Sequence, residues 1–117
     1  MDMLGPLQLK IMNYLWDGHA PQTAQDIADY LNERGSKHVT STITTVLLSL
    51  EKRKLVYRQR NGHAYVYESF SGGRTEYRLA VLHYIIHDVY ESHAGLLYAN
   101  LSQILEPEKW ATSQSHS

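Results

Sequence analysis

The apolar residues between positions 39 and 52 repeat with the period of a helix. Ile43, Val46, Leu47 and Leu50 fall at i, i+3, i+4 and i+7, a spacing that places them on one stripe of an α-helix. The opposite face carries several short hydroxyl side chains, where a solvated helix more often carries Glu and Lys. The pattern therefore predicts one buried face and one face that is free to meet a partner closely.

Directly after this helix, two strand-like segments flank Asn61-Gly62. An Asn-Gly pair supplies the positive φ values that a tight type I′ turn needs, so residues 56–68 are predicted to form a β-hairpin with Asn61-Gly62 as its turn. That turn predicts the register, with each residue of the first strand opposite a partner in the second. The predicted pairs are Arg60–His63, Gln59–Ala64, Arg58–Tyr65, Tyr57–Val66 and Val56–Tyr67.

Two further helices are predicted before this unit. The first runs from about Pro6, a favourable first helical residue, to Asp17. Its apolar face holds Leu7, Ile11, Tyr14 and Leu15. The second begins at Thr23, which forms a capping-box pattern with Asp26. The resulting order of helix, turn, helix, helix and hairpin predicts a mainly α fold with one small hairpin, the winged helix-turn-helix.

Charge is concentrated in the same region. Residues 36–65 hold six of the eleven Lys and Arg residues and one acid, so the segment is +5 although the whole chain is −1. The remainder holds five basic and eleven acidic residues and is −6. A concentrated positive patch binds a phosphate backbone by releasing its counterions, which favours DNA over the alternative of an ordinary solvated helix and hairpin.

The predicted contacts divide by chemistry. Hydroxyl side chains of the third helix are expected at base edges, and the cations of the helix end and hairpin at phosphates. Thr45 has an alternative role, because its hydroxyl could bond back to the carbonyl of Ser41. The expected DNA-binding residues are Ser41, Thr42, Thr44, Thr45, Ser49, Lys52, Arg53, Arg58, Arg60 and His63.

Composition removes several other classes of protein. The 117 residues include no cysteine, which excludes a disulfide framework, a thiol nucleophile and a thiolate metal cluster. No nucleophile elbow, phosphate-binding glycine loop or zinc-protease motif occurs, so we expect neither an enzyme nor a cofactor. We see no apolar run of bilayer length and no leader, which predicts a cytoplasmic protein with no membrane partner.

The second half of the chain predicts a dimer. From Arg74 to about Glu91, apolar residues lie on more than one side of the expected helix, and one small domain can bury only one of them. A larger monomeric core is the alternative. We expect a DNA-binding domain at 1–71, a helical dimerisation region at 72–106 and a disordered tail at 107–117. The expected dimer residues are Leu79, Leu82, Ile86, Val89, Leu97 and Leu101.

His83, His87 and Glu91 follow one another at i, i+4 and i+8 in the same predicted helix. This spacing would place two imidazoles and a carboxylate on one face, where they could share a metal ion. No strict motif surrounds them, and packing or solvated histidines are commoner. No metal is therefore assigned, and a His-based metal-responsive repressor stays an alternative.

The sequence resembles the penicillinase and methicillin-resistance (BlaI/MecI) repressors and the related copper-responsive (CopY) repressors. The resemblance covers about residues 5–105 and rests on three stretches. These are Leu9-x-Ile11-Met12-x-x-Leu15-Trp16, Thr42-Ile43-x-Thr45-Val46-Leu47-x-x-Leu50-x-Lys52, and Leu55-Val56 leading to Ala64-Tyr65-Val66-Tyr67. The family implies a homodimeric winged-helix repressor that binds a palindromic double-stranded operator with the helix around Thr42 to Ser49.

Two departures from the family pattern bear on the expected contacts. Ser49 stands where many members carry Arg or Lys, and Lys54 replaces a frequent glycine. The absence of cysteine excludes the copper-sensing mechanism. Antibiotic-responsive members are inactivated by proteolysis, but no cleavage site is identifiable here, so a regulatory protease and a small inducer both stay open as partners. A protein-interaction adaptor is the alternative function, and the +5 segment favours the repressor.

Overall fold

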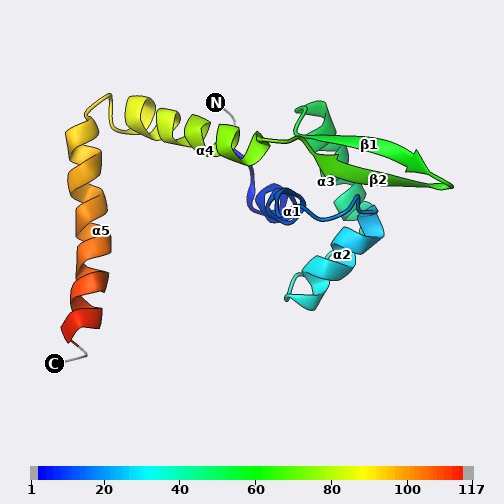
Figure 1. The fold of residues 1–117 in the computed structure, drawn as a ribbon, viewed down its shortest axis with the longest axis horizontal. Helices are drawn as coiled ribbons and strands as arrows, with labels where there is room; N and C mark the ends of the chain where they lie inside the picture. Colours follow the sequence, from blue (N-terminus) through cyan, green and yellow to red (C-terminus); the bar gives the residue numbers. More distant parts are fainter. Residues whose placement is uncertain (1–2, 115–117) are drawn as a thin grey trace. The chain divides into compact units, whose positions relative to one another are not determined.

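The structure is a computed structural model that describes the backbone of residues 3–114 and the side chains of residues 3–106. The chain forms two compact units, one ending at Tyr77 and the other beginning at Arg78. The predicted class, mainly α with one hairpin, is confirmed (Figure 1). In chain order the elements are α1 (Pro6–Trp16), α2 (Ala24–Glu33), α3 (Thr40–Lys52), β1 (Val56–Asn61), β2 (Ala64–Ser69), α4 (Gly73–Tyr84), the π-helix η1 (Ile85–Val89) and α5 (Ala94–Gln114).

Local capping starts α1 and α2 where the sequence predicts. The Gly5 amide donates to Oε1 of Gln8 at 2.9 Å, which satisfies one of the donors that a helix leaves unpaired at its start. At α2, the Asp26 amide donates to Oγ1 of Thr23 and the Thr23 amide donates to Oδ2 of Asp26, both at 3.0 Å. The predicted capping box, with Asp in place of Glu, is therefore confirmed.

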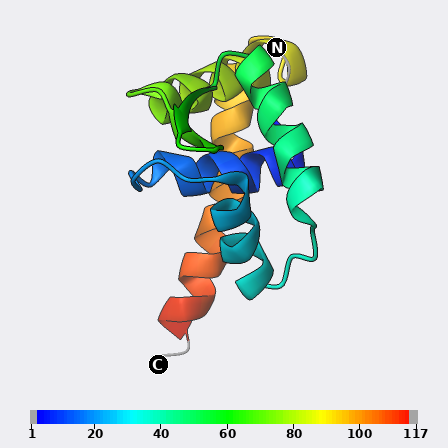
Figure 2. The same ribbon diagram turned by 90° about the vertical axis from the view of Figure 1, so that its right-hand side faces the viewer.

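The core of the first unit lies among the three helices and the base of the hairpin. The stripe predicted for α3 is confirmed, since Ile43, Leu47 and Leu50 are fully buried and Val46 is half-buried. In Figure 2, α1 runs crosswise to α3. The largest fully buried side chains are Ile11, Met12, Ile27, Ile43, Leu47, Leu50 and Val56.

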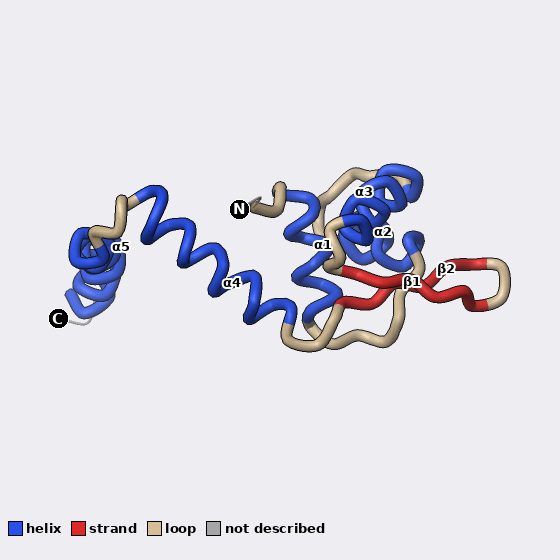
Figure 3. The backbone as a smooth tube through the Cα atoms, turned by 90° about the horizontal axis from the view of Figure 1, so that it is seen from above, coloured by secondary structure: helices blue, strands red, loops and turns tan. Residues whose placement is uncertain are grey.

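A short backbone pairing joins the turn before α2 to the hairpin. The Tyr67 amide donates to the Gln22 carbonyl at 2.8 Å, and the Gln22 amide donates to the Tyr67 carbonyl at 3.2 Å. The Tyr67 side chain is buried in the core beneath this pairing. The base of the hairpin is thus fixed on the helices, while its tip reaches beyond them (Figure 3).

The predicted hairpin register is wrong. The turn lies one residue later in the chain than predicted, so each residue of β1 pairs with a residue two positions later in β2. The observed pairs include Asn61–Ala64, Arg60–Tyr65 and Val56–Ser69, so Gly62-His63 forms the turn. Within the hairpin, Gly62 is the residue with a positive φ, at +66°, which suits a turn with glycine at its first central position and leaves Asn61 extended. Because the shift moves every partner by two residues, each side chain stays on its predicted face.

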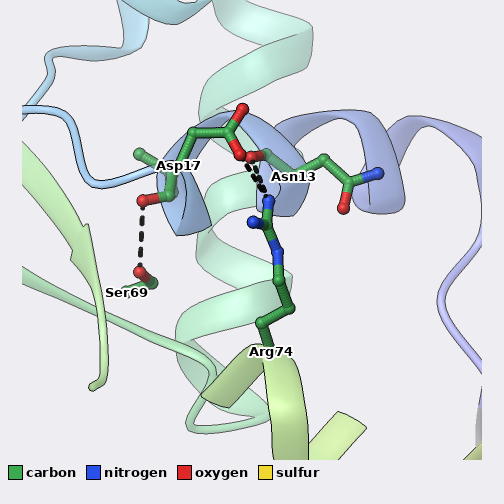
Figure 4. A network of polar contacts seen from close by, with 5 residues as sticks. Asn13, Asp17, Ser69 and Arg74 are labelled. Atoms are coloured by element: carbon green, nitrogen blue, oxygen red, sulfur yellow. Dashed lines mark hydrogen bonds and ion pairs between the residues drawn. The ribbon is translucent and has the colours of Figure 1, made fainter. Parts of the chain in front are cut away.

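The start of α4 is held against α1 by an arginine (Figure 4). Nη2 of Arg74 donates to the Asn13 carbonyl at 2.9 Å and forms an ion pair with Oδ1 of Asp17 at 2.7 Å. One turn later, the Leu4 amide donates to the Tyr77 hydroxyl at 2.9 Å. The first unit therefore includes the first residues of α4, beyond residue 71, where the sequence placed the end of the DNA-binding domain.

The second unit agrees with the sequence at one point and differs at another. After η1, Glu91 and Ser92 adopt positive φ values of +49° and +67°, so the helical run ends at Val89, close to the predicted end at about Glu91. The helix α5 then continues through Pro107 to Gln114, where the sequence predicted a disordered tail. Residues 115–117 of that tail lie outside the described residues.

Across residues 3–114, no helix combines the length and the apolar character that crossing a bilayer requires.

Candidate nucleic-acid interface

The exposed face of α3 lies opposite its buried stripe. Helical spacing places Ser41, Thr45, Leu48 and Lys52 along the centre of this face, and all four are exposed. Leu48 is 43% exposed and was not among the residues that the sequence singled out. The sequence could have indicated its exposure, because Leu48 lies at helical spacing between Thr45 and Lys52.

Three of the predicted hydroxyl groups donate to carbonyls of their own helix. The acceptor is the Thr40 carbonyl for Thr44, the Ser41 carbonyl for Thr45 and the Val46 carbonyl for Ser49, with oxygen–oxygen distances of 3.1, 3.0 and 2.6 Å. The structure thus shows the alternative role considered for Thr45, in which its hydroxyl bonds back to the Ser41 carbonyl. A hydroxyl carries one proton, so in this conformation each of these groups can accept a hydrogen bond but has no second proton to donate.

Ser49 also lies toward α1 rather than on the centre of the exposed face. Its Oγ accepts a hydrogen bond from Nε2 of Gln8 at 3.2 Å, and the residue is half-buried. Thr44 is half-buried on the opposite flank of α3. Of the predicted hydroxyl residues, Ser41, Thr42 and Thr45 are therefore the exposed ones.

The entry to α3 is tied to α2. The His38 amide donates to Oδ1 of Asn32 at 3.0 Å, and Nδ2 of Asn32 donates to the His38 carbonyl at 2.9 Å. Oγ1 of Thr40 lies 2.6 Å from Oε1 of Gln25 in a third contact. These bonds hold the turn between α2 and α3, so the exposed face of α3 has a defined orientation on the core of the first unit.

The cations at the end of α3 differ in their surroundings. Lys52 and Lys54 are exposed, whereas Arg53 is half-buried with Nη1 3.5 Å from Oε1 of Gln8. Lys54 has a φ of +62° and follows the helix in the left-handed region. Its amide donates to the Glu51 carbonyl at 2.9 Å, and the next amide, of Leu55, reaches back to the Leu50 carbonyl at 3.0 Å. This is the hydrogen-bond pattern with which glycine commonly closes a helix.

The hairpin adds two arginines around one tyrosine. The guanidinium groups of Arg58 and Arg60 lie 4.4 and 5.4 Å from the centre of the Tyr65 ring. Nε of Arg58 also pairs with Oε2 of Glu51 at 3.1 Å, so the acid of the +5 segment lies against one of its cations. Arg60 and His63 are exposed toward the tip. The ion pair places the first strand next to the end of α3, which joins helix and hairpin in one surface.

The predicted dimer residues lie in a unit with little core of its own. Leu79, Leu82, Val89 and Leu101 are between 43% and 58% exposed. Ile86 and Leu97 are half-buried. Further apolar side chains on α5, such as Ile104 at 67%, extend the same exposed set.

The predicted histidine and glutamate cluster does not form as the spacing suggested. The rings of His83 and His87 stack with centroids 5.7 Å apart, and Nδ1 of His87 lies 3.0 Å from Oγ of Ser92. Glu91 falls beyond the helix in the left-handed turn, so it does not continue their face. Within the part of the chain that the structure describes, no three His, Cys, Asp or Glu residues come together as a metal site.

Three helices followed by a hairpin whose base pairs with the segment before α2 define the winged-helix class. Comparison with known families gives the more specific assignment. The chain belongs to the penicillinase repressor family, whose sequence pattern matches residues 4–111.

The relatives agree with this assignment. The transcriptional regulator BlaI of Mycobacterium tuberculosis, in strains CDC 1551 / Oshkosh and ATCC 25618 / H37Rv, is 35% identical over 69 residues, which cover 59% of this chain and 49% of the relative. The chain therefore matches about half the length of these curated relatives. The family and its relatives are transcriptional regulators and not enzymes.

Solved structures show the same fold at lower identity. MepR, a transcription regulator of the Staphylococcus aureus multidrug efflux pump MepA, has a TM-score of 0.57 at 18% identity, over 97% of this chain and 77% of that chain. A complex of S. aureus MepR with DNA has a TM-score of 0.55 at 22% identity, over 89% and 80%. The regulator BldR from Sulfolobus solfataricus has a TM-score of 0.53 at 22% identity, over 89% and 75%.

Proposed function

We propose that this protein is a transcriptional repressor that binds double-stranded operator DNA with the exposed face of α3 in the major groove and the hairpin along the phosphates. One observation carries the proposal. The exposed face, the cationic helix end and the hairpin belong to one segment, residues 36–65, which holds six of the eleven Lys and Arg residues. Membership of a repressor family and the fold shared with a regulator solved on DNA support it.

The ten predicted residues then have different positions in the complex. Ser41, Thr42 and Thr45 meet the groove, and Thr44 and Ser49 line its two sides. Lys52, Arg53, Arg60 and His63 lie within reach of phosphates, which fix the position of the protein without reading sequence. Arg58 joins them when a phosphate competes with Glu51 for its guanidinium, because this pair is partly exposed and therefore weak.

The active form is proposed to be a homodimer, with residues 72–106 as the dimerisation region. The supporting observation is the exposed apolar set on α4, η1 and α5, which a monomer would leave in water. A two-fold dimer presents two copies of α3, so the operator is expected to be a palindrome. Its half-sites would be about 34–36 Å apart or a multiple of that distance.

The decisive experiment is capture of genomic DNA fragments by the full-length chain, followed by titration of one enriched duplex and its scrambled counterpart at several salt concentrations. We expect enrichment of a palindrome and a logarithmic affinity that falls steeply with salt, because each neutralised phosphate releases counterions. Recovery of no sequence, together with salt-independent residual binding, would instead support the protein-interaction adaptor.

A further inference from the structure

The centre of the exposed face of α3 includes one apolar side chain, that of Leu48. Leu48 follows Thr45 by three residues and precedes Lys52 by four, so the three side chains form one row opposite the buried stripe. The Leu48 side chain holds no hydrogen-bonding atom and is 43% exposed. Whatever meets this point of the helix must therefore be recognised by apolar contact.

The neighbouring hydroxyl groups reinforce this character. The protons of Thr44, Thr45 and Ser49 are donated to carbonyls of α3 itself. To give a hydrogen bond to an acceptor on a base, each group would first have to give up that internal bond. The middle of α3 is consequently a poor donor surface, although its hydroxyl oxygens can still accept.

The charges around Leu48 indicate which kind of partner it meets. Lys52 continues the row, Lys54 follows the helix, and Arg60 lies on the adjoining hairpin, all of them exposed. Cations that border an apolar side chain suit a DNA major groove, because the groove lies between two phosphate backbones. Within that groove, one base offers an apolar group to a side chain, namely thymine with its 5-methyl group.

We propose that Leu48 is a specificity-determining residue that contacts thymine 5-methyl groups in the major groove. The operator half-site would then carry thymine where Leu48 meets it, and cytosine, which lacks the methyl group, would be rejected at that position. This inference rests on the proposed function and deepens it by naming the base feature that the centre of α3 reads.

The test removes one methyl group at a time. A duplex selected from a random library by the full-length chain is resynthesised with deoxyuridine in place of each thymine, a change that leaves Watson–Crick pairing intact. We expect binding to weaken about fourfold for each methyl group buried against Leu48, from the usual contribution of one buried carbon. Thymines outside the half-sites serve as controls and should tolerate the change.

Protein variants assign the effect to the residue. In Leu48→Ala, the sensitive thymines should lose their sensitivity, because the side chain no longer reaches the methyl group. Leu48→Met keeps an apolar side chain of similar volume and should keep the sensitivity. Met3→Ala, a change at an exposed apolar residue outside α3, is the matched control and should bind as the unaltered chain does.

Two results would overturn the inference. One is a selected duplex in which no deoxyuridine weakens binding by the unaltered chain. The other is a sensitive thymine that stays equally sensitive in Leu48→Ala. Both leave the proposed function intact, since a sequence was selected. Failure of the selection to enrich any sequence would remove the proposed function and this inference together.

Discussion

Lys54 occupies a backbone conformation that suits glycine better than lysine. Its φ of +62° brings the Cβ close to the following carbonyl oxygen, which costs an L-residue about 1 kcal/mol relative to glycine. We predict that Lys54→Gly raises the free energy of unfolding by about 1 kcal/mol, measured by urea denaturation. The matched control is Lys52→Gly inside α3, which should lower it by about 0.5–1 kcal/mol.

The same exchange separates two roles of Lys54. If its ammonium group contacts DNA, the more stable Lys54→Gly variant should bind operator and random duplex less tightly and with a smaller salt dependence. A variant that loses stability would contradict the conformational argument. A variant that binds DNA unchanged would limit Lys54 to closing the helix.

Tyr57 links the two strands through its proton. Its hydroxyl donates to the Glu68 carboxylate, and this hydrogen bond raises the pKa of Tyr57 above 10.0. Because the folded state holds the proton more tightly than the unfolded chain, the contribution is fully present below about pH 10 and is lost as pH rises through the folded pKa. We predict a decline in unfolding free energy above pH 10 that is shallower in Tyr57→Phe, measured by urea denaturation between pH 8 and 11.

Tyr14 is a second tyrosine whose pKa is raised, so the same pH-dependent measurement applies to it. Burial is the first cause that raises the pKa of Tyr14, and the Asp26 carboxylate adds to it. Tyr14→Phe should therefore also make the alkaline decline shallower, and the double variant should do so more than either single one. An unchanged decline in both single variants would refute the assignment to these phenols.

At the level of single residues, the sequence predicted those interactions whose two partners are close together in the chain. The Thr23 and Asp26 cap was recognisable because its partners are three residues apart. The internal bonds of Thr44 and Ser49 were not, since the same hydroxyls can equally point to a partner. Leu48 was overlooked because an exposed leucine is common on any surface. Its proposed role follows from its neighbours, because the hydroxyl groups beside it donate within α3 and exposed cations lie around it.

At the level of elements, the helices were predictable and the hairpin only in part. The buried stripe of α3 follows from spacing that any helix must obey. The turn does not, because Asn61-Gly62 and Gly62-His63 both place a glycine where φ is positive. The structure selects the second, which adds the Asn61–Ala64 pair to the ladder.

The hairpin and α3 are predicted to do different work. Arg60 lies near the hairpin tip, with Nε 3.3 Å from the Gly62 carbonyl. We predict that Arg60→Ala weakens operator and random duplex about equally and lowers the salt slope by about one unit, because one phosphate contact is lost. Titrations on both duplexes at several salt concentrations measure this.

The contrasting variant is Arg58→Ala. Arg58 pairs with Glu51, so its removal also leaves that carboxylate unpaired beside the end of α3. Its effect on binding should exceed that of Arg60→Ala, because a cation is lost and an acid is uncovered. An Arg60→Ala effect confined to the operator would show that the hairpin reads sequence, contrary to the proposed division.

At the level of the whole molecule, sequence predicted apolar residues that one small core cannot cover. It predicted the end of this helical run at about Glu91, but not the two consecutive positive φ values of Glu91 and Ser92, which remove Glu91 from the face of His83 and His87. It also could not separate a dimer from a larger core. The exposure of residues such as Leu101 and Ile104 now favours the dimer.

The proposed dimer gives a direct prediction. The full-length chain should sediment as a dimer at micromolar concentration, and Leu101→Asp combined with Ile104→Asp should be monomeric, because two charges would enter an apolar interface. The monomer should bind the operator at least tenfold more weakly, having lost one of two linked half-site contacts. Met3→Asp, at an exposed apolar residue of the first unit, is the control. A monomeric unaltered chain would contradict the proposal.

The backbone pairing of Gln22 with Tyr67 allows hydrogen exchange to measure how often the base of the hairpin separates from the helices. Both amides are protected by bonds that cross from the turn before α2 to β2, so neither can exchange with deuterium unless the hairpin separates from the helices. Their protection factors should therefore be similar and much larger than that of His63 at the exposed tip. Bound operator, which would hold helix and hairpin on one ligand, should slow both by the same factor.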